Sequence, residues 1–407
     1  MTAQRDWIPI VMNDPERILI LDGARTPIGR FGGAFAGVPA HELGATAAQA
    51  ALARARVSGT DLDEVVMGCI GQVGPDAYNA RRVALAAGVP VTVPAYTVNR
   101  LCGSGLQAIW SAAMQMRWGG VDFALAGGDE NMSRMPFYDF GARSGYKLGD
   151  RTLTDGTVAM LTDPFSRVHM GVTAENVARK YGIDRSMQDE FAAESQRRAA
   201  TTAAAAAFAE EICAVDVAGP KGTTVTVSTD EHPKPQTTVD TLAALRPAFE
   251  DGGTVTAGNA SGINDGAGVV VLAREAVAAE RGLRGLAVIE SVATAAIEPE
   301  LMGYAPVPAL AKLFEQTGLT PGDIDIIELN EAFASQAVAV IRDAKLDPAK
   351  TNPYGGAIAL GHPVGATGGI LTLRVAKALA REDGELGIIT MCIGGGQALA
   401  ALLRRVH

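Results

Sequence analysis

One cysteine stands where its thiol would be reactive. Cys102 lies in the segment NRLCGSG, after the apolar stretch AYTVN and before an apolar helical pattern that begins at Gly103. A thiol at a helix N-terminus feels the partial positive charge of the helix dipole, which favours the thiolate. The glycines would let backbone N–H groups face a bound carbonyl oxygen. We predict that Cys102 is a nucleophile beside an oxyanion hole; the alternative is a buried cysteine in a tight turn.

A histidine and an asparagine are placed to assist such a nucleophile. The chain has five histidines, and His362 lies in GHPVG, between a Gly-rich loop and a predicted helix. Imidazole in this position is a good general base for a thiol; a structural histidine in a polar loop is the alternative. Asn330 ends the apolar stretch DIDIIEL. Its amide can fix a water or polarise a carbonyl, although taken alone it is equally a helix N-cap.

A second cysteine ends another apolar strand. Cys392 follows GIITM and precedes three glycines that begin at Gly394. These glycines would present N–H groups to a developing oxyanion, and the thiol could act as an acid or a base. A buried cysteine at a strand end is the alternative. The four cysteines contain no C-x-x-C pair, so we expect no metal site, and Cys69 and Cys213 are interpreted as small buried side chains.

The elements that must position these residues occur in two similar series. The first has apolar strands starting at residues 18, 64 and 121, and helices over residues 41–56 and 103–116. The second has strands starting at residues 285, 323 and 385, and helices over residues 307–317 and after the Gly-rich turn at residue 355. The alternation predicts an α/β fold, and the common order predicts an internal duplication.

The two series divide the chain into three regions. Residues 1–130 form the N-terminal half, residues 131–258 an inserted loop region, and residues 259–407 the C-terminal half. The insertion carries the turn signals DPF, GPKG and HPKPQ and one long helical stretch over residues 185–209. Because insertions at strand ends commonly become binding loops, we expect this region to cover the site.

Composition excludes several classes of protein. The formal net charge is −10, which argues against nucleic acid as a partner. No apolar run reaches the roughly 18–20 residues of a membrane span. The N-terminal segment MTAQRDWIPIVMNDPER lacks the apolar core of a signal peptide. We therefore expect a cytoplasmic protein with no membrane partner.

Seven segments together resemble the thiolase family. They are NRLCGSGLQA, GGDENMS, HMGVTAENVA, TAGNASGINDGA, NEAFA, GGAIALGHPVGATG and CIGGGQ, which stand in thiolase order and span nearly the whole chain. The likeness is to bacterial acetoacetyl-CoA thiolases and broad-range β-ketothiolases. It implies a thiolase fold of two αβαβα halves. It also implies an acetyl-CoA C-acetyltransferase or C-acyltransferase, which catalyses reversible Claisen condensation and thiolysis of acetyl-CoA and short-chain 3-ketoacyl-CoA with ping-pong kinetics.

The resemblance implies a role for each reactive residue. Cys102 is the acylated nucleophile, and His362 activates it and helps to hold a thioester oxygen. Cys392 moves the proton of the α-carbon, and Asn330 anchors a water in one oxyanion hole. The backbone N–H groups of Cys102 and Gly394 form the other oxyanion hole.

The resemblance also implies how the substrate binds. Coenzyme A and acyl-CoA are substrates, and no tightly bound cofactor is implied. The residues that match the family's pantetheine tunnel are Leu161, His169, Met170, Ala257, Ser261 and Phe333. Lys234 and Thr241 match positions near the nucleotide end. A homotetramer is implied, built as a dimer of dimers, with dimers in some members.

Several alternatives remain beside this interpretation. A thiolase of longer-chain fatty acid β-oxidation, alone or as the subunit of a complex, would carry the same motifs. A ketoacyl synthase lacks the second catalytic cysteine, and a non-catalytic acyl-CoA-binding relative typically lacks one of the four reactive residues. Asp129, Tyr354 and Ala398 depart from the family pattern. We expect Tyr354 and Ala398 to affect the acyl pocket, so the sequence leaves chain length and physiological direction open.

Overall fold

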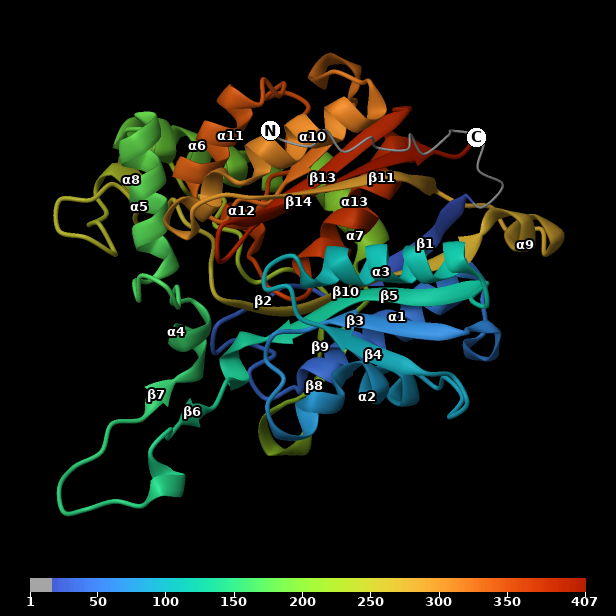
Figure 1. The fold of residues 1–407 in the computed structure, drawn as a ribbon, viewed down its shortest axis with the longest axis horizontal. Helices are drawn as coiled ribbons and strands as arrows, with labels where there is room; N and C mark the ends of the chain where they lie inside the picture. Colours follow the sequence, from blue (N-terminus) through green and yellow to red (C-terminus); the bar gives the residue numbers. More distant parts are fainter. Residues whose placement is uncertain (1–16) are drawn as a thin grey trace, which may run out of the picture.

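The computed structural model describes residues 17–407 (Figure 1). The prediction that no signal peptide is present concerns residues 1–16, which lie outside the described part. A ten-stranded sheet runs through the molecule, and its strands belong to two halves with the same internal order. None of the helices in residues 17–407 is long and apolar enough to cross a membrane.

The first half of the sheet has five main strands. In spatial order they are β4 (Ala95–Val98), β3 (Glu64–Gly68), β5 (Phe123–Asn131), β10 (Asn264–Arg274) and β1 (Ile18–Arg25). β3 runs parallel to β4 and β5, whereas β10 runs antiparallel to β5 and β1. The short β2 (Gly29–Arg30) pairs with β10. β5 and nearly all of β10 are buried, as expected for strands covered on both faces.

The second half repeats this arrangement. Its strands follow the order β12 (Ile326–Leu329), β13 (Leu386–Ile393), β14 (Gln397–Arg405) and β11 (Ala287–Ala296). The parallel and antiparallel relations match those of the first half. Thr351 forms a parallel bridge with Ile327, at the place that β4 takes in the first half. The halves join through a short antiparallel pairing of β1 with β11.

Helices cover and separate the two halves (Figure 1). α1 (Ala40–Ala55) and α2 (Asn79–Ala86) lie on the outer face of the first half, and α10 (Pro306–Thr317) and α11 (Ala334–Asp343) on that of the second. α3 (Ser104–Trp118) and α13 (Thr367–Arg381) contact each other between the sheets. The result is five layers, αβαβα, which confirms the predicted fold class. α9 (Glu275–Glu280) and α12 (Ala357–Leu360) are short connecting helices.

The structure corrects two details of the predicted organisation. β10 lies in residues 259–407, which the sequence division gave to the C-terminal half, yet it pairs with β1 and β5 of the first half. The long helix predicted over residues 185–209 is two helices, α6 (Arg185–Ala199) and α7 (Thr202–Glu211). Thr201 caps α7, because its hydroxyl accepts a hydrogen bond from the Ala204 N–H at 3.1 Å.

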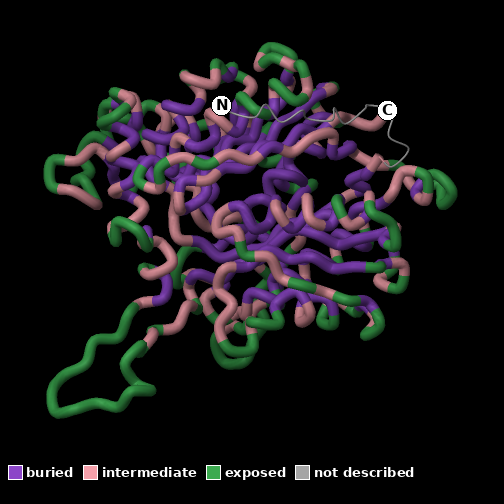
Figure 2. Tube along the Cα trace, viewed as in Figure 1, coloured by how far each residue is buried: buried purple, intermediate pink, exposed green. Residues whose placement is uncertain are grey.

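The inserted region holds short elements and a projecting arm. The arm contains β6 (Phe137–Tyr138) and β7 (Thr154–Asp155), and most of it is exposed (Figures 1 and 2). The remaining elements of the region are α4 (Gly156–Met160), α5 (Met170–Tyr181), β8 (Val215–Ala218), β9 (Thr224–Val227) and α8 (Val239–Ala243). α5 packs against α11, so this region reaches the second half close to the end of β12.

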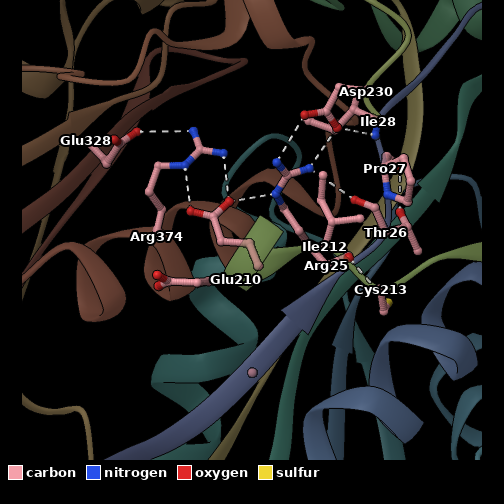
Figure 3. A network of polar contacts seen from close by, with 12 residues as sticks. Arg25, Thr26, Pro27, Ile28, Glu210, Ile212, Cys213, Asp230, Glu328 and Arg374 are labelled. Atoms are coloured by element: carbon pink, nitrogen blue, oxygen red, sulfur yellow. Dashed lines mark hydrogen bonds and ion pairs between the residues drawn. The ribbon is translucent and has the colours of Figure 1, made fainter. Parts of the chain in front are cut away.

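A buried ion network ties the halves together (Figure 3). The Glu211 carboxylate of α7 accepts from Arg25 of β1 at 2.7 Å and from Arg374 of α13 at 3.2 Å. Arg25 also pairs with Asp230 at 2.8 Å, and Arg374 lies 3.7 Å from Glu328. These side chains are almost wholly removed from solvent. A network of this kind fixes the relative position of strand and helices, although its formation costs desolvation.

Candidate active site

Cys102 lies in a tight turn between β4 and α3. Leu101, directly before it, has φ +49°, a left-handed conformation that is uncommon for leucine. The Ser104 hydroxyl holds this turn, because it accepts from the Arg100 N–H at 2.9 Å and donates to the Leu101 carbonyl at 2.7 Å. A Cβ on Gly103 would lie 2.5 Å from the terminal methyl of Ile393, so a larger residue after the cysteine would have to displace the Ile393 side chain. The sequence thus places a strained turn where the nucleophile was predicted.

The Cys102 thiol is protonated at neutral pH. Burial raises its pKa to about 11, although hydrogen bonds from the Gly394 and Cys102 N–H groups act in the opposite direction. The charge of Glu130 also raises the pKa. The expectation that the helix N-terminus would favour a thiolate is therefore wrong, because burial outweighs the local hydrogen bonds. A thiol of this kind needs a base to become a nucleophile.

His362 is the residue predicted to be that base, and its neighbours fix its tautomer. Its Nδ1 lies 2.7 Å from the Thr367 hydroxyl, which itself donates to the Pro363 carbonyl at 3.0 Å. A hydroxyl has one proton, so Nδ1–H must be the donor to Thr367, and Nε2 keeps its lone pair. Burial lowers the pKa of His362 to about 4, so the ring is neutral. The Asn264 side chain accepts from the His362 backbone N–H at 2.9 Å and fixes the loop.

Asn330 lies beside the free nitrogen of this ring. Its Nδ2 is 3.4 Å from His362 Nε2. Its Oδ1 is buried and accepts no hydrogen bond within residues 17–407. A buried acceptor normally finds a partner, so this oxygen suits a water or a polar substrate atom. The backbone N–H of Asn330 donates to the Thr390 carbonyl of β13, so Asn330 is not free to move.

Cys392 ends β13 next to the glycine turn that leads into β14. Gly395 and Gly396 both have φ +79°, which side chains other than glycine rarely adopt. Burial, and then the nearby Cys102, raise the pKa of Cys392 far above its usual value. The electrostatic effect of Cys102 on Cys392 means that the fold brings the two predicted thiols together. Gly394 donates toward Cys102, so the predicted backbone donor also lies at this site.

An apolar wall leads away from the two thiols. Cys392, Met170 and Phe333 belong to one hydrophobic cluster. His169 stacks on Phe249 with ring centres 4.8 Å apart, and Phe249 meets the edge of Phe333 at 6.2 Å. Three of the residues predicted to line a tunnel therefore border the reactive centre. Phe249 was missed, because nothing in its local sequence shows that it packs between two distant segments.

Two of the other predicted substrate-binding residues lie beside this wall, and three are exposed. Leu161 accepts from the Met170 N–H, and Ser261 donates its N–H to the residue before Phe333. Ala257 is exposed. Lys234 and Thr241 are exposed too, and local hydrogen bonds fix them: the Lys234 N–H donates to Gln196, and Thr241 forms a capping box at the start of α8.

The residues that departed from the family pattern lie in different places. The buried ring of Tyr354 carries its hydroxyl to Glu382 and Arg381 near the C-terminal end of α13, away from the predicted reactive residues. The expectation that Tyr354 affects the acyl pocket is therefore not supported. Ala398 is directly opposite Cys392 in the β13–β14 pair and is fully buried, so it does border the site.

Comparison with known proteins identifies the family. The model of the thiolase N-terminal domain matches residues 18–276, and that of the thiolase C-terminal domain matches residues 283–405. The chain belongs to the thiolase family, as the sequence motifs predicted. The boundary between the two matches falls between β10 and β11. This agrees with the strand order of the sheet, in which β10 belongs to the first half and β11 to the second.

Individual relatives are similar over almost their whole length. The chain is 49% identical to the beta-ketothiolase BktB of Cupriavidus necator, over 96% of this chain and 99% of the relative. The structure of the Bacillus anthracis acetyl-CoA acetyltransferase matches with a TM-score of 0.94 and 40% identity, covering 96% of this chain and 99% of that one. Human mitochondrial 3-ketoacyl-CoA thiolase in complex with CoA matches with a TM-score of 0.92 and 40% identity, covering 96% and 98%.

Proposed function

We propose that this chain is an acetyl-CoA C-acyltransferase that cleaves and forms 3-ketoacyl-CoA through an acyl group on Cys102. The observations that support the proposal are two close pairs on a thiolase fold, Cys102 with Cys392 and His362 with Asn330. The loops that carry Cys102 and His362 pack together, since a Cβ on Gly105 would lie 2.8 Å from the Gly365 carbonyl oxygen. Each group has the protonation state that the reaction requires: two neutral thiols and a neutral imidazole with a free Nε2.

The first half of the reaction acylates the enzyme. His362 Nε2 takes the proton of the Cys102 thiol, and the sulfur attacks the 3-keto carbon of the substrate. The bond between carbons 2 and 3 then breaks, and its electron pair becomes the enolate of acetyl-CoA. Cys392 protonates the α-carbon of this enolate. The Asn330 side chain and His362 would hold the enolate oxygen, and oxyanion donors of this kind contribute about 3–4 kcal/mol each.

The second half of the reaction transfers the acyl group to coenzyme A. Cys392, which gave its proton to the enolate, takes the proton of the coenzyme A thiol, and the coenzyme A sulfur attacks the acyl carbon on Cys102. The carbon–sulfur bond to Cys102 breaks, and His362 returns its proton to the Cys102 sulfur. The N–H groups of Gly394 and Cys102, which already point toward the sulfur, would hold the oxyanion of the intermediate. Coenzyme A would lie along the wall of His169, Met170 and Phe333. Because the first product leaves before the second substrate reacts, the kinetics should be ping-pong.

The test is a series of thiolysis rates with 3-ketoacyl-CoA substrates of increasing chain length and free coenzyme A. Measurable kcat/KM, with parallel lines in double-reciprocal plots, supports the proposal. Activity confined to acetoacetyl-CoA would define a short-chain enzyme, and similar rates on longer chains would define a broad-range one. A folded protein that cleaves none of these substrates contradicts the proposal and favours a non-catalytic acyl-CoA-binding protein.

We also propose that the chain assembles as a homotetramer. The projecting arm carries exposed apolar side chains, among which Phe140 is 80% exposed, and an apolar patch of this kind marks an interaction site. A second set, with Trp118 at 92%, lies near the open edge of the sheet at β4. Light scattering should give the mass of four chains for the native protein, and Phe140→Asp should reduce it to two. A monomeric native protein contradicts this proposal.

A further inference from the structure

Glu130, at the end of β5, makes contacts that link both halves of the reactive centre. Its carboxylate is buried, and Oε2 accepts from the Ile70 N–H and the Gly365 N–H, each at 3.0 Å. Oε1 accepts from the Gly71 N–H at 2.9 Å and contacts the Cys69 thiol at 3.7 Å. One side chain of the first half therefore binds three backbone donors, one of which belongs to the loop of the second half that carries His362.

The loop that carries His362 has three points of attachment. The Asn264 side chain holds the His362 backbone N–H, and Thr367 holds its ring. Glu130 is the third, through Gly365, and it is the only carboxyl group of the three. The space is tight, since a Cβ on Gly365 would lie 2.6 Å from Glu130 Oε2. A carboxylate that binds three N–H groups is held firmly in position, because a hydrogen bond to a charged acceptor is stronger than one to a neutral acceptor.

We propose that Glu130 is a positioning residue for the thiolase reaction, whose carboxylate sets the place of the His362 loop relative to Cys102. This inference rests on the proposed function. Glu130 reaches the chemistry through Gly365 and His362 rather than by contact with substrate. A loop displaced by about 1 Å can reduce the rate about 100-fold, because proton transfer requires close alignment.

The charge of Glu130 has a second, separable effect. Within the described chain, the titratable groups that act on the Cys102 thiol include Cys392 and Glu130. Burial raises the pKa of Glu130 to about 7, so Glu130 is an anion that opposes a thiolate in the alkaline range where Cys102 titrates. The hydrogen bonds to Gly365 and the charge near Cys102 can therefore be changed independently. Their consequences differ: the first affects the rate of the chemical step, and the second affects the pKa of the nucleophile.

Two substitutions separate these effects. Glu130→Gln keeps the length of the side chain and removes its charge. The carbonyl oxygen of the new amide will face the backbone N–H groups of Ile70 and Gly365, because turning the NH2 group toward them would lose more hydrogen bonds. Glu130→Asp keeps the charge but is one methylene too short to reach Gly365 and Gly71 together. Asp129→Asn is the matched control, because Asp129 is the neighbouring buried carboxyl group but its side chain accepts from Asn79 at 2.7 Å instead of binding the Gly365 N–H.

Two measurements on each variant decide the proposal: kcat and KM for thiolysis, and the pH profile of Cys102 alkylation by iodoacetamide. We expect Glu130→Asp to lower kcat about 100-fold with KM changed less than about threefold, and to leave the alkylation pKa unchanged. Glu130→Gln should keep kcat within about tenfold of the native value and lower the alkylation pKa. Asp129→Asn should change neither.

The proposal is overturned if Glu130→Asp retains native kcat, or if both Glu130 variants lose the same rate. A general loss of structure would lower the unfolding midpoint and affect the two variants alike, which circular dichroism would reveal. The alkylation measurement needs no substrate, so it remains informative if the native protein shows no thiolysis. That last result would contradict the proposed function itself.

Discussion

At the scale of single residues, the reactive centre consists of neutral groups held ready for proton transfer. Burial raises the pKa of Cys102 to about 11 and lowers that of His362 to about 4, so a thiolate–imidazolium pair is not the resting state. In the proposed mechanism, activation accompanies substrate binding, when a proton moves from sulfur to Nε2 in one step with attack. This state protects the nucleophile from oxidation, because the thiolate is the reactive form.

The pKa of Cys102 leads to a prediction about alkylation. The reaction of iodoacetamide with Cys102 should be slow at pH 7 and should accelerate as the pH rises toward 10, because the thiolate fraction grows throughout that range. The rate is measured by mass spectrometry of the peptide that contains residue 102. Exposed small thiols such as glutathione provide the reference. A rate that is already at its plateau at pH 7 would show that Cys102 is a thiolate.

The role of Cys392 leads to a second prediction. Cys392→Ala should lower kcat by about 100- to 10,000-fold, which is the usual contribution of a general acid or base. Cys102 should still become acylated by the substrate, and intact-protein mass spectrometry would detect the acyl group. Cys213→Ala, far from the centre, is the control with native turnover. A Cys392 variant with native kcat would favour a condensing enzyme that works without a second thiol.

At the scale of elements, the site depends on the close contact of α3 and α13. A Cβ on Gly368 would lie 2.1 Å from the Leu106 backbone nitrogen, and one on Gly105 would lie 2.8 Å from the Gly365 carbonyl. The two helices each follow one of the catalytic segments, so their approach sets the distance between Cys102 and His362. Glycine at the crossing is what allows the two backbones to meet.

Gly368→Ala tests this crossing. The added methyl group must push α13 away from α3, which should lower the free energy of unfolding by about 1–3 kcal/mol and reduce kcat as His362 moves. Urea unfolding and thiolysis rates measure the two effects. Gly37→Ala is the matched control, since a Cβ at Gly37 has nothing within 4 Å. Equal behaviour of the two variants would show that the helix crossing has room to spare.

At the scale of the whole molecule, the buried network around Glu211 joins β1, α7 and α13. Burial alone would raise the pKa of Glu211, but Arg374 and Arg25 outweigh burial, and the pKa is lowered. The Glu211 carboxylate therefore stabilises the folded protein fully at a pH above its pKa in the unfolded chain. This stabilisation is lost as the pH falls toward the pKa of Glu211 in the folded protein. The network makes the two halves dependent on each other.

Glu211→Gln should lower the free energy of unfolding by about 3–5 kcal/mol at pH 7, because it leaves two buried guanidinium groups without their shared anion. The loss should become smaller in acid, where the native carboxylate is also protonated. Glu275→Gln, at an exposed ion pair with Arg17, should cost no more than about 1 kcal/mol. Chemical unfolding at several pH values measures both. A pH-independent difference would show that the charge of Glu211 is not what stabilises the native protein.

The sequence alone determined the general fold, and it predicted the reactive residues. Cys102, His362, Cys392 and Asn330 stand in short segments whose glycines and strand ends are local properties, so their chemistry could be predicted without coordinates. The two series of elements likewise follow from local periodicity, and they led to the five-layered fold that the structure contains. The division at residue 258 was wrong for β10, because a strand's partners are chosen by the whole sheet and not by its neighbours in sequence.

The tertiary structure decided everything that depends on burial and on distant contacts. The neutral state of Cys102 arises from desolvation, which outweighs the helix N-terminus that the sequence made visible. The tautomer of His362 depends on Thr367 and Pro363. The position of the His362 loop depends on Glu130, which binds Gly365 of that loop although the two residues are 235 positions apart. Residue types predict which atoms can react, whereas the packing of the chain fixes their solvation and partners, and these set the pKa values.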